Sequence, residues 1–185
     1  MRTGEVVETF EKEGEKFTVR YPKMRDWKGF LRHLNSLVED EEVIGFQKKR
    51  TEEEGIEWMA EKLSAIEKEE LILLAVEHKG KVKGRADVSK GIGAKRHLVR
   101  RTITLDKEIR RKGVGTKLVN ILNREIKKNF KDAEIISAST LEDNKSARAL
   151  MKEKTDLKFA GRIKNVYKTL YGDINDEISY GKKID

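Results

Sequence analysis

The sequence predicts a single α/β (α+β) domain in which helices and strands share one mixed sheet. Short apolar or alternating runs, typical of strands, are separated by longer segments with apolar residues at helical spacing. The chain has 185 residues, enough for one hydrophobic core, and no Ser-, Gly- or Pro-rich linker divides it. The predicted order is β-α-α-β-β-β-α-β-α-β-β.

Residues 17–21 alternate apolar and polar side chains, which predicts a strand with one buried face. Residues 1–16 are weakly patterned and allow a short hairpin around Gly14. Asp26 is a candidate N-cap for a helix over residues 27–38, where apolar residues recur at helical spacing.

Thr51 and Glu54 have the spacing of a capping box, which predicts a second helix from about residue 51 to 66. The continuous apolar run 71–76 is typical of a buried strand, and a turn at Gly80 predicts a hairpin with a return strand. The remaining predicted elements, in chain order, are the return strand 81–88, a strand at 97–105, a helix at 114–129, a strand at 133–139, a helix at 144–154, and two strands at 157–166 and 174–184.

Composition limits the range of functions that the chain can have. Charged residues make up 40% of the chain and the net charge is +8, but the signs are mixed locally, which favours an ion-paired surface over a basic face for an anionic partner. The absence of cysteine excludes disulfides, thiolate metal sites and a cysteine nucleophile. No apolar run approaches the ~18 residues of a membrane span, and no apolar signal segment opens the sequence, so we expect a cytoplasmic protein.

Residues 103–118 combine a strand, a Gly-x-Gly turn and an amphipathic helix. Gly113 and Gly115 allow a tight turn and a close approach of a ligand to the backbone. The start of the helix presents unpaired N–H groups and a positive dipole end, which suit phosphate oxygens. Three basic residues, Arg110, Arg111 and Lys112, add positive charge at the same place.

Two common phosphate motifs do not fit this segment. The Walker pattern lacks its Gly-Lys-Ser/Thr, and the dinucleotide fingerprint lacks its third glycine, where Leu118 stands. What remains is Arg110-x-x-Gly113-x-Gly115, which resembles the pyrophosphate signature of the GNAT family of N-acetyltransferases. The pattern Asn144-x-x-Ala147-x-x-Leu150 resembles the next cofactor-contacting helix of that family. An ordinary helix entry with basic surface residues is the alternative.

The resemblance implies a single mixed, mostly antiparallel sheet flanked by helices, the acyl-CoA N-acyltransferase fold, over residues 17–182, with residues 1–16 as an N-terminal extension. It also implies transfer of acetyl from acetyl-coenzyme A, without a metal, to a protein N-terminus, a lysine or a small-molecule amine. Homodimers are common in this family. The cofactor-binding residues that the resemblance implies are Ile103, Leu105, Arg110, Arg111, Lys112, Gly113, Val114, Gly115, Thr116 and Asn144.

The catalytic residues are less clearly marked. The family's tyrosine acid falls at Met151, which cannot donate a proton, so we expect Tyr167 on a late strand to replace it. His97 is the best candidate base by residue type. Asp87 and Glu77 are alternative bases. The simpler interpretations are that Tyr167 is a packing residue and that His97 is a surface residue.

Two other functions compete with catalysis. Met151 favours an acyl-CoA-binding sensor with weak or no activity on the same fold. The net charge of +8 suggests a nucleic-acid-binding module, but no zinc-finger or ribonucleoprotein motif is found, and only 6% of residues are aromatic. Acidic runs at 39–42 and 52–54 either attract a cationic acceptor or are solvated helix ends.

Overall fold

A computed structural model describes residues 3–39, 48–168 and 172–184. Its described strands form one mixed sheet in the order β1-β2-β3-β4-β5-β6-β8-β7, in which only β5 and β6 are parallel neighbours. This confirms the predicted mixed, mostly antiparallel sheet. The strands are β1 Val6–Lys12, β2 Glu15–Arg20, β3 Leu71–His78, β4 Lys81–Lys90, β5 Leu98–Leu105, β6 Ile135–Leu141, β7 Lys158–Lys168 and β8 Ile174–Lys183.

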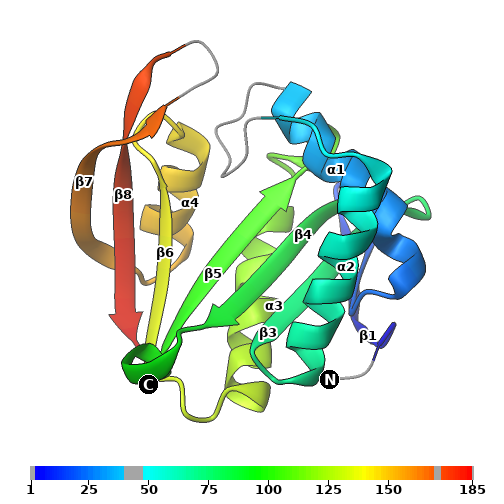
Figure 1. The fold of residues 1–185 in the computed structure, drawn as a ribbon, viewed down its shortest axis with the longest axis horizontal. Helices are drawn as coiled ribbons and strands as arrows, with labels where there is room; N and C mark the ends of the chain where they lie inside the picture. Colours follow the sequence, from blue (N-terminus) through cyan, green and yellow to red (C-terminus); the bar gives the residue numbers. More distant parts are fainter. Residues whose placement is uncertain (1–2, 40–47, 169–171, 185) are drawn as a thin grey trace.

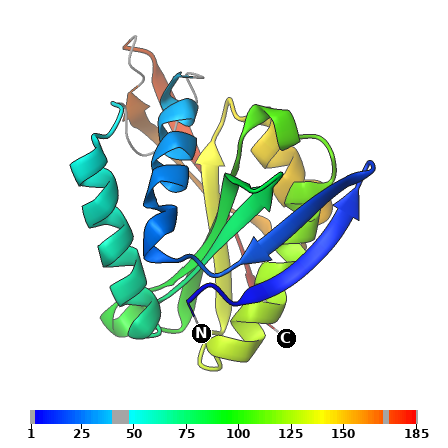
Figure 2. The same cartoon turned by 90° about the vertical axis from the view of Figure 1, so that its right-hand side faces the viewer.

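Helices cover both faces of the sheet. Figures 1 and 2 show α1 and α2 on one face and α3 and α4 on the other. None of the described helices is long and apolar enough to cross a membrane. The predicted elements are confirmed, with bounds that shift by no more than two residues. The helices are α1 Trp27–Glu39, α2 Glu52–Glu67, α3 Val114–Asn129 and α4 Lys145–Lys154.

The hairpin expected around Gly14 is present. Glu13 and Gly14 both have positive φ, at 50° and 73°, as a tight two-residue hairpin turn requires. β1 pairs along the length of β2, so the predicted N-terminal extension adds an edge strand to the same sheet.

Strand β3 separates two hydrophobic cores. Ile72, Leu74 and Val76 pack with α3 on one face, whereas Leu71 and Leu73 pack with α1 and α2 on the other. Because successive side chains of a strand point to opposite faces, a continuous apolar run is buried on both sides.

The predicted helix starts have different outcomes. The capping box of α2 is confirmed: Thr51 N–H donates to Glu54 Oε2 at 2.8 Å, and Glu54 N–H donates to Thr51 Oγ1 at 3.2 Å. Asp26 directly precedes α1, but its carboxylate accepts from Lys23 N–H at 2.7 Å and pairs with Arg20. It therefore fixes the turn before α1 and does not cap the helix as predicted.

Much of the charge is paired between elements, as the mixed-sign pattern predicts. Glu8 of β1 pairs with Lys117 and Arg124 of α3, and hydrogen bonding by Lys117 is the main cause that lowers the pKa of Glu8. A buried bond adds to this link, because Tyr21 donates its hydroxyl to Glu125 Oε2 of α3 at 2.5 Å. Burial and this bond raise the pKa of Tyr21.

Replacing Tyr21 by phenylalanine should lower the free energy of unfolding by about 1–3 kcal/mol, because Glu125 would lose a buried donor. Chemical denaturation checks this. Glu125→Gln keeps an acceptor for the tyrosine and should cost less. Equal losses of stability in both variants, or no loss in Tyr21→Phe, would show that the Tyr21–Glu125 hydrogen bond does not stabilise the packing of α3.

Candidate active site

The pairing between β5 and β6 stops partway along both strands. The paired residues are Leu98 with Ile135, Val99 with Ile136, and Arg100 with Ser137. Both strands continue beyond this point, β5 to Leu105 and β6 to Leu141, and they diverge as Figure 1 shows. Beyond Arg100 and Ser137, the facing edges of β5 and β6 are therefore not paired with each other in the described structure. We call the space between these two edges the β5–β6 gap.

Hydrogen-bond directions along β5 show which backbone groups face this gap. Asp106 N–H, just after β5, donates to Lys83 O beside β4 at 2.8 Å, whereas Leu105 O accepts from Arg110 Nε at 2.7 Å. Directions alternate along an antiparallel pair, so Ile103 points the same way as Leu105, away from β4. The N–H groups of Ile103 and Leu105 therefore face the gap, which is where the sequence placed cofactor contacts.

The opposite edge of the gap was not found from the sequence. Glu142 N–H, just after β6, donates to Asp176 O beside β8 at 3.0 Å. By the same alternation, the backbone of Ser139 faces β5. The side chain of Ser139 also accepts a hydrogen bond from Arg100 of β5. Nothing in the local sequence distinguishes Ser139, because this direction depends on pairing with a strand about forty residues later.

The loop after β5, where the sequence predicts a phosphate site, has an alternating backbone conformation. The sign of φ alternates along it: Arg111 is at +61°, Gly113 is at +73°, and Lys112 between them is not positive. Such alternation turns successive N–H groups toward a common point. Gly113 is the N-cap of α3 and supplies no side-chain cap, so the first N–H groups of the helix, from Val114 to Thr116, point outward with the positive dipole end.

Gly115 lies where α3 approaches α4, but the packing of the two helices does not itself require a glycine there. A Cβ added at Gly115 would lie 3.5 Å from Leu150 Cδ2 of α4, within ordinary contact distance. Asn144 caps α4, since its Oδ1 accepts from Ala147 N–H at 3.0 Å. The predicted cofactor residues of the loop and of α4 are thus brought to one end of the β5–β6 gap.

The basic side chains of the loop are partly committed to the protein. Arg110 holds the carbonyl of Leu105, and Lys112 forms an ion pair with Glu15 of β2. Arg111 is exposed. The loop therefore keeps its positive charge, and the side chains of Arg110 and Lys112 also attach it to the sheet.

A buried polar network below this loop was not predicted from the sequence. His33 of α1 is fully buried, with Nδ1 against Asp106 and Nε2 2.8 Å from Thr104 Oγ1. Burial acts to raise the pKa of Asp106, but His33 and nearby Lys83 lower it overall. The helical spacing of Phe30, His33 and Leu34 predicts that His33 is buried. Its partners could not be inferred from the sequence, because they lie about seventy residues later in the chain.

Tyr167 lies beside the gap, on the face of the sheet that carries α1 and α2. Its hydroxyl donates to Glu177 Oε2 of β8 at 3.1 Å, and Ser179 Oγ lies 3.4 Å from Glu177 Oε1. Arg100 of β5 stands 3.8 Å from the same carboxylate. Burial and the Glu177 carboxylate raise the pKa of Tyr167, so it keeps its proton at neutral pH.

The other proposed catalytic positions lie elsewhere. His97 precedes β5 at its paired end, about 26 Å of extended chain away from Leu105 at ~3.3 Å per residue, and stays a prediction from residue type alone. Glu77 holds Arg20 at 2.9 Å and serves the turn before α1. Met151 packs against the α3 core with Ile103, as an apolar residue would.

The acidic runs contribute little to the described site. Residues 40–42 lie outside the described part of the chain, and Glu52, Glu53 and Glu54 form the first turn of α2. Among the described residues, no group of three or more histidine and carboxylate side chains is arranged to hold a metal ion.

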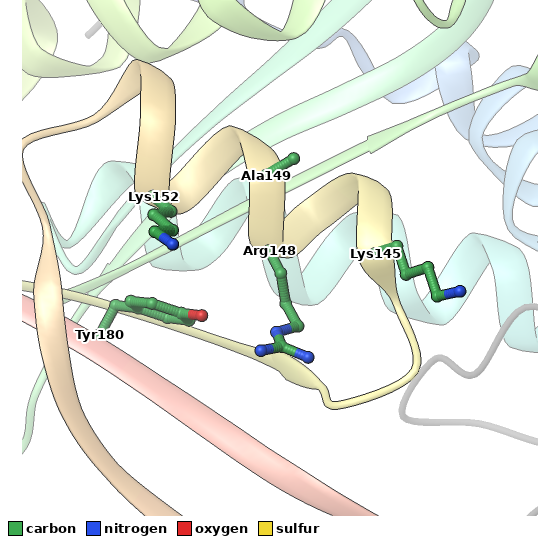
Figure 3. Close-up of a pocket in the computed structure, with 5 residues that line it drawn as sticks. All are labelled: Lys145, Arg148, Ala149, Lys152 and Tyr180. Atoms are coloured by element: carbon green, nitrogen blue, oxygen red, sulfur yellow. The ribbon is translucent and has the colours of Figure 1, made fainter.

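A separate pocket of about 210 Å³ lies between α4 and β8, one strand beyond β6 from the gap. Figure 3 shows Lys145, Arg148 and Lys152 on one face of α4 above the ring of Tyr180. Arg148 donates to Glu142 O at 3.1 Å, which ties it to the end of β6.

Similar folds occur in solved structures of acetyltransferases. An N-acetyltransferase from Staphylococcus aureus Mu50 superposes with a TM-score of 0.80 at 22% identity, covering 91% of this chain and 99% of that one. A ribosomal-protein-alanine N-acetyltransferase from Brucella melitensis gives 0.77 at 20% identity, over 90% and 99%. The putative acetyltransferase yncA from Salmonella typhimurium, solved with acetyl-CoA, gives 0.77 at 18% identity, over 91% and 94%.

Comparison with curated protein sequences gave no match. A family model described as the acetyltransferase (GNAT) family matches residues 31–155, which is more than half of the chain. The chain therefore belongs to the GNAT family of N-acetyltransferases, whose co-substrate is acetyl-coenzyme A.

Proposed function

We propose that this protein transfers acetyl directly from acetyl-coenzyme A to an amine that binds on the face of the sheet that carries α1 and α2, called the acceptor face below. The observation that carries the proposal is the continuity between the β5–β6 gap and the uncapped start of α3. An extended amide-bearing arm fits an open strand edge, and a pyrophosphate fits a helix N-terminus. Acetyl-coenzyme A has both parts joined in one molecule.

The proposed contacts follow the order of the chain. The backbone of Ile103 and Leu105 pairs with the pantetheine arm, and the N–H groups from Arg111 to Thr116 hold the pyrophosphate. The charges of Arg110, Arg111 and Lys112 add attraction for the phosphates, and Asn144 contacts the cofactor from α4. Support comes from the unpaired edge of β5, the alternating φ of the loop and the uncapped start of α3, which follow one another along the chain.

In the proposed reaction, the amine nitrogen attacks the thioester carbonyl, a C–N bond forms and the C–S bond breaks. The N–H of Leu105 is positioned to polarise the carbonyl oxygen. The departing thiolate takes a proton from Tyr167, which replaces the acid that Met151 cannot supply. The raised pKa of Tyr167 keeps that proton available across neutral pH.

The acceptor is proposed only as a class: a protein N-terminus, a lysine or a small-molecule amine. The name of the Brucella melitensis protein, a ribosomal-protein-alanine N-acetyltransferase, makes a peptide with N-terminal alanine the first acceptor to test. Spermidine and a lysine-containing peptide with a blocked N-terminus represent the other two.

Acetyl-coenzyme A should raise the melting temperature, because a ligand of the folded state stabilises it by mass action. At a concentration one hundred times Kd, the gain is about 2.7 kcal/mol, or roughly 5–10 °C for a chain of this size. Differential scanning fluorimetry measures the shift. A well-folded sample that does not respond at saturating concentration would contradict the proposal.

Replacing Gly115 by valine should abolish that thermal shift, because a branched side chain would fill the space that phosphates need beside the backbone. The first added carbon fits next to Leu150, so the ligand-free fold should survive. Gly161→Val on β7 is the matched control, since nothing lies within 4 Å of a Cβ added there. Full binding by Gly115→Val would mean that the loop does not hold the pyrophosphate.

Replacing Tyr167 by phenylalanine should lower kcat by about 100-fold, as expected for loss of a general acid, while the thermal shift with acetyl-coenzyme A persists. On the alkaline side, wild-type activity should decline only above pH 10, because the pKa of Tyr167 lies above its ordinary value of 10.0. Release of coenzyme A with the three acceptors measures both effects. An unchanged pH profile in Tyr167→Phe would remove this residue from the mechanism, and binding without any coenzyme A release would favour the sensor function.

A further inference from the structure

A partly buried carboxylate on β4 lies one strand away from the gap and lacks a full set of partners. The side chain of Asp87 is 14% exposed, and its Oδ1 has no hydrogen-bond partner among the described residues. The nearest charged atom is Arg85 Nε at 3.4 Å, which also lacks a hydrogen bond. A buried polar oxygen left unpaired costs stability, so its retention calls for another role.

The position of Asp87 matches the acceptor face. Its neighbours Ala86 and Val88 pack into the core under α3, so the side chain of Asp87 points to the opposite face. In the sheet register, Asp87 is paired with Thr102 of β5. Thr102 lies two residues beyond the last pair between β5 and β6 and next to Ile103, whose N–H faces the gap.

This register places Asp87 one strand away from the open edge of β5. Neighbouring strands are about 4.8 Å apart, so a group bound over the gap on the acceptor face is within reach of Asp87 through one water molecule. The approach is along the sheet surface beneath α2, where Arg85 lies 5.8 Å from the ring of Trp58.

The charges around Asp87 come from three elements. Arg85 lies on the same strand, Lys62 projects from α2, and Arg100 lies on β5, whereas the paired residue on β3 is the apolar Leu73. Burial raises the pKa of Asp87 and outweighs the lowering by these three cations and by a hydrogen bond from Thr102. The carboxylate can therefore bind a proton more readily than an exposed aspartate.

The carboxylate on the other side of the gap is in a different environment. Glu177 accepts from Tyr167 and lies within 3.4 Å of the Ser179 hydroxyl and 3.8 Å of Arg100. Its oxygens are occupied by donors, whereas Asp87 keeps one oxygen unpaired. Two carboxyl groups in such contrasting environments commonly divide acid and base roles.

We propose that Asp87 is the general base of the acetyl transfer and that Glu177 positions Tyr167, the acid. This rests on the proposed function. The attacking amine gives a proton to Oδ1 of Asp87, directly or through one water, as its nitrogen bonds to the carbonyl carbon. The electron pair of the broken C–S bond leaves on sulfur, which takes the proton of Tyr167.

The variant Asp87→Asn should lose at least 100-fold in kcat with the acceptor that wild type turns over fastest among the alanine peptide, the lysine peptide and spermidine. Its thermal shift with acetyl-coenzyme A should match wild type, which shows that the fold and the cofactor site are intact. Asp87→Glu keeps the carboxylate and should retain measurable turnover. Asp156→Asn, with a side chain that is 92% exposed, is the matched control and should behave as wild type.

The pH profile separates a base from a structural residue. Since the ionised form accepts the proton, wild-type kcat/KM should fall as pH drops through the raised pKa of Asp87, and Asp87→Asn should lack this acidic limb. Wild-type kcat and an unchanged profile in Asp87→Asn would overturn the assignment while leaving cofactor binding untouched. Absence of a thermal shift in the wild-type protein would instead contradict the proposed function.

A measurement without an acceptor completes the test. The carboxyl ¹³C resonance of Asp87, assigned by its loss in Asp87→Asn, should titrate above the ordinary aspartate value of 3.8 in the complex with acetyl-coenzyme A. Titration at or below that value would overturn the assignment even if none of the three amines is turned over.

Discussion

The structure depends on one parallel pair of strands whose pairing stops before either strand ends. β5 and β6 are inner strands of the sheet, yet their pairing stops at Arg100 and Ser137. Backbone N–H and C=O groups inside a protein are almost always paired, so an open edge in the middle of a sheet is costly unless a ligand or water fills it. A pantetheine arm carries amide groups that can do so, and this links the fold directly to its co-substrate.

The elements around the gap hold its two ends in place. At the upper end, His33 and Asp106 connect α1 to the residue that follows β5, while Arg110 fastens the phosphate loop to Leu105. Beneath the sheet, Tyr21 and Glu125 fix α3 against β2. The start of α3 and the open edge of β5 are therefore held in a fixed relative position. A ligand that contacts both requires this. Charged residues contribute mainly as ion pairs between such elements.

Local patterns in the sequence were sufficient to predict most of the elements. Helical spacing, alternation and a continuous apolar run predicted the helices α1 to α4 and the strands β2 to β8, because each pattern is contained within its own segment. Strand β1 lies in residues 1–16, which are weakly patterned and allowed only a short hairpin around Gly14. The Arg-x-x-Gly-x-Gly spacing predicts a phosphate loop after β5, and this stays a prediction. Asp26 was assigned wrongly because Arg20 and Lys23 compete for its carboxylate. Ser139, His33 and the surroundings of Asp87 could not be predicted, since each depends on strand register or on a partner far away in the chain.

Amide hydrogen exchange along β5, with and without acetyl-coenzyme A, tests the central claim most directly. The N–H groups of Ile103 and Leu105 face the gap and should exchange much more slowly when the ligand is bound. Those of Thr102 and Thr104, which face β4 and are already paired, should change little. Slowing that is uniform along the strand, or absent at Ile103 and Leu105, would contradict the view that the open edge of β5 binds the co-substrate.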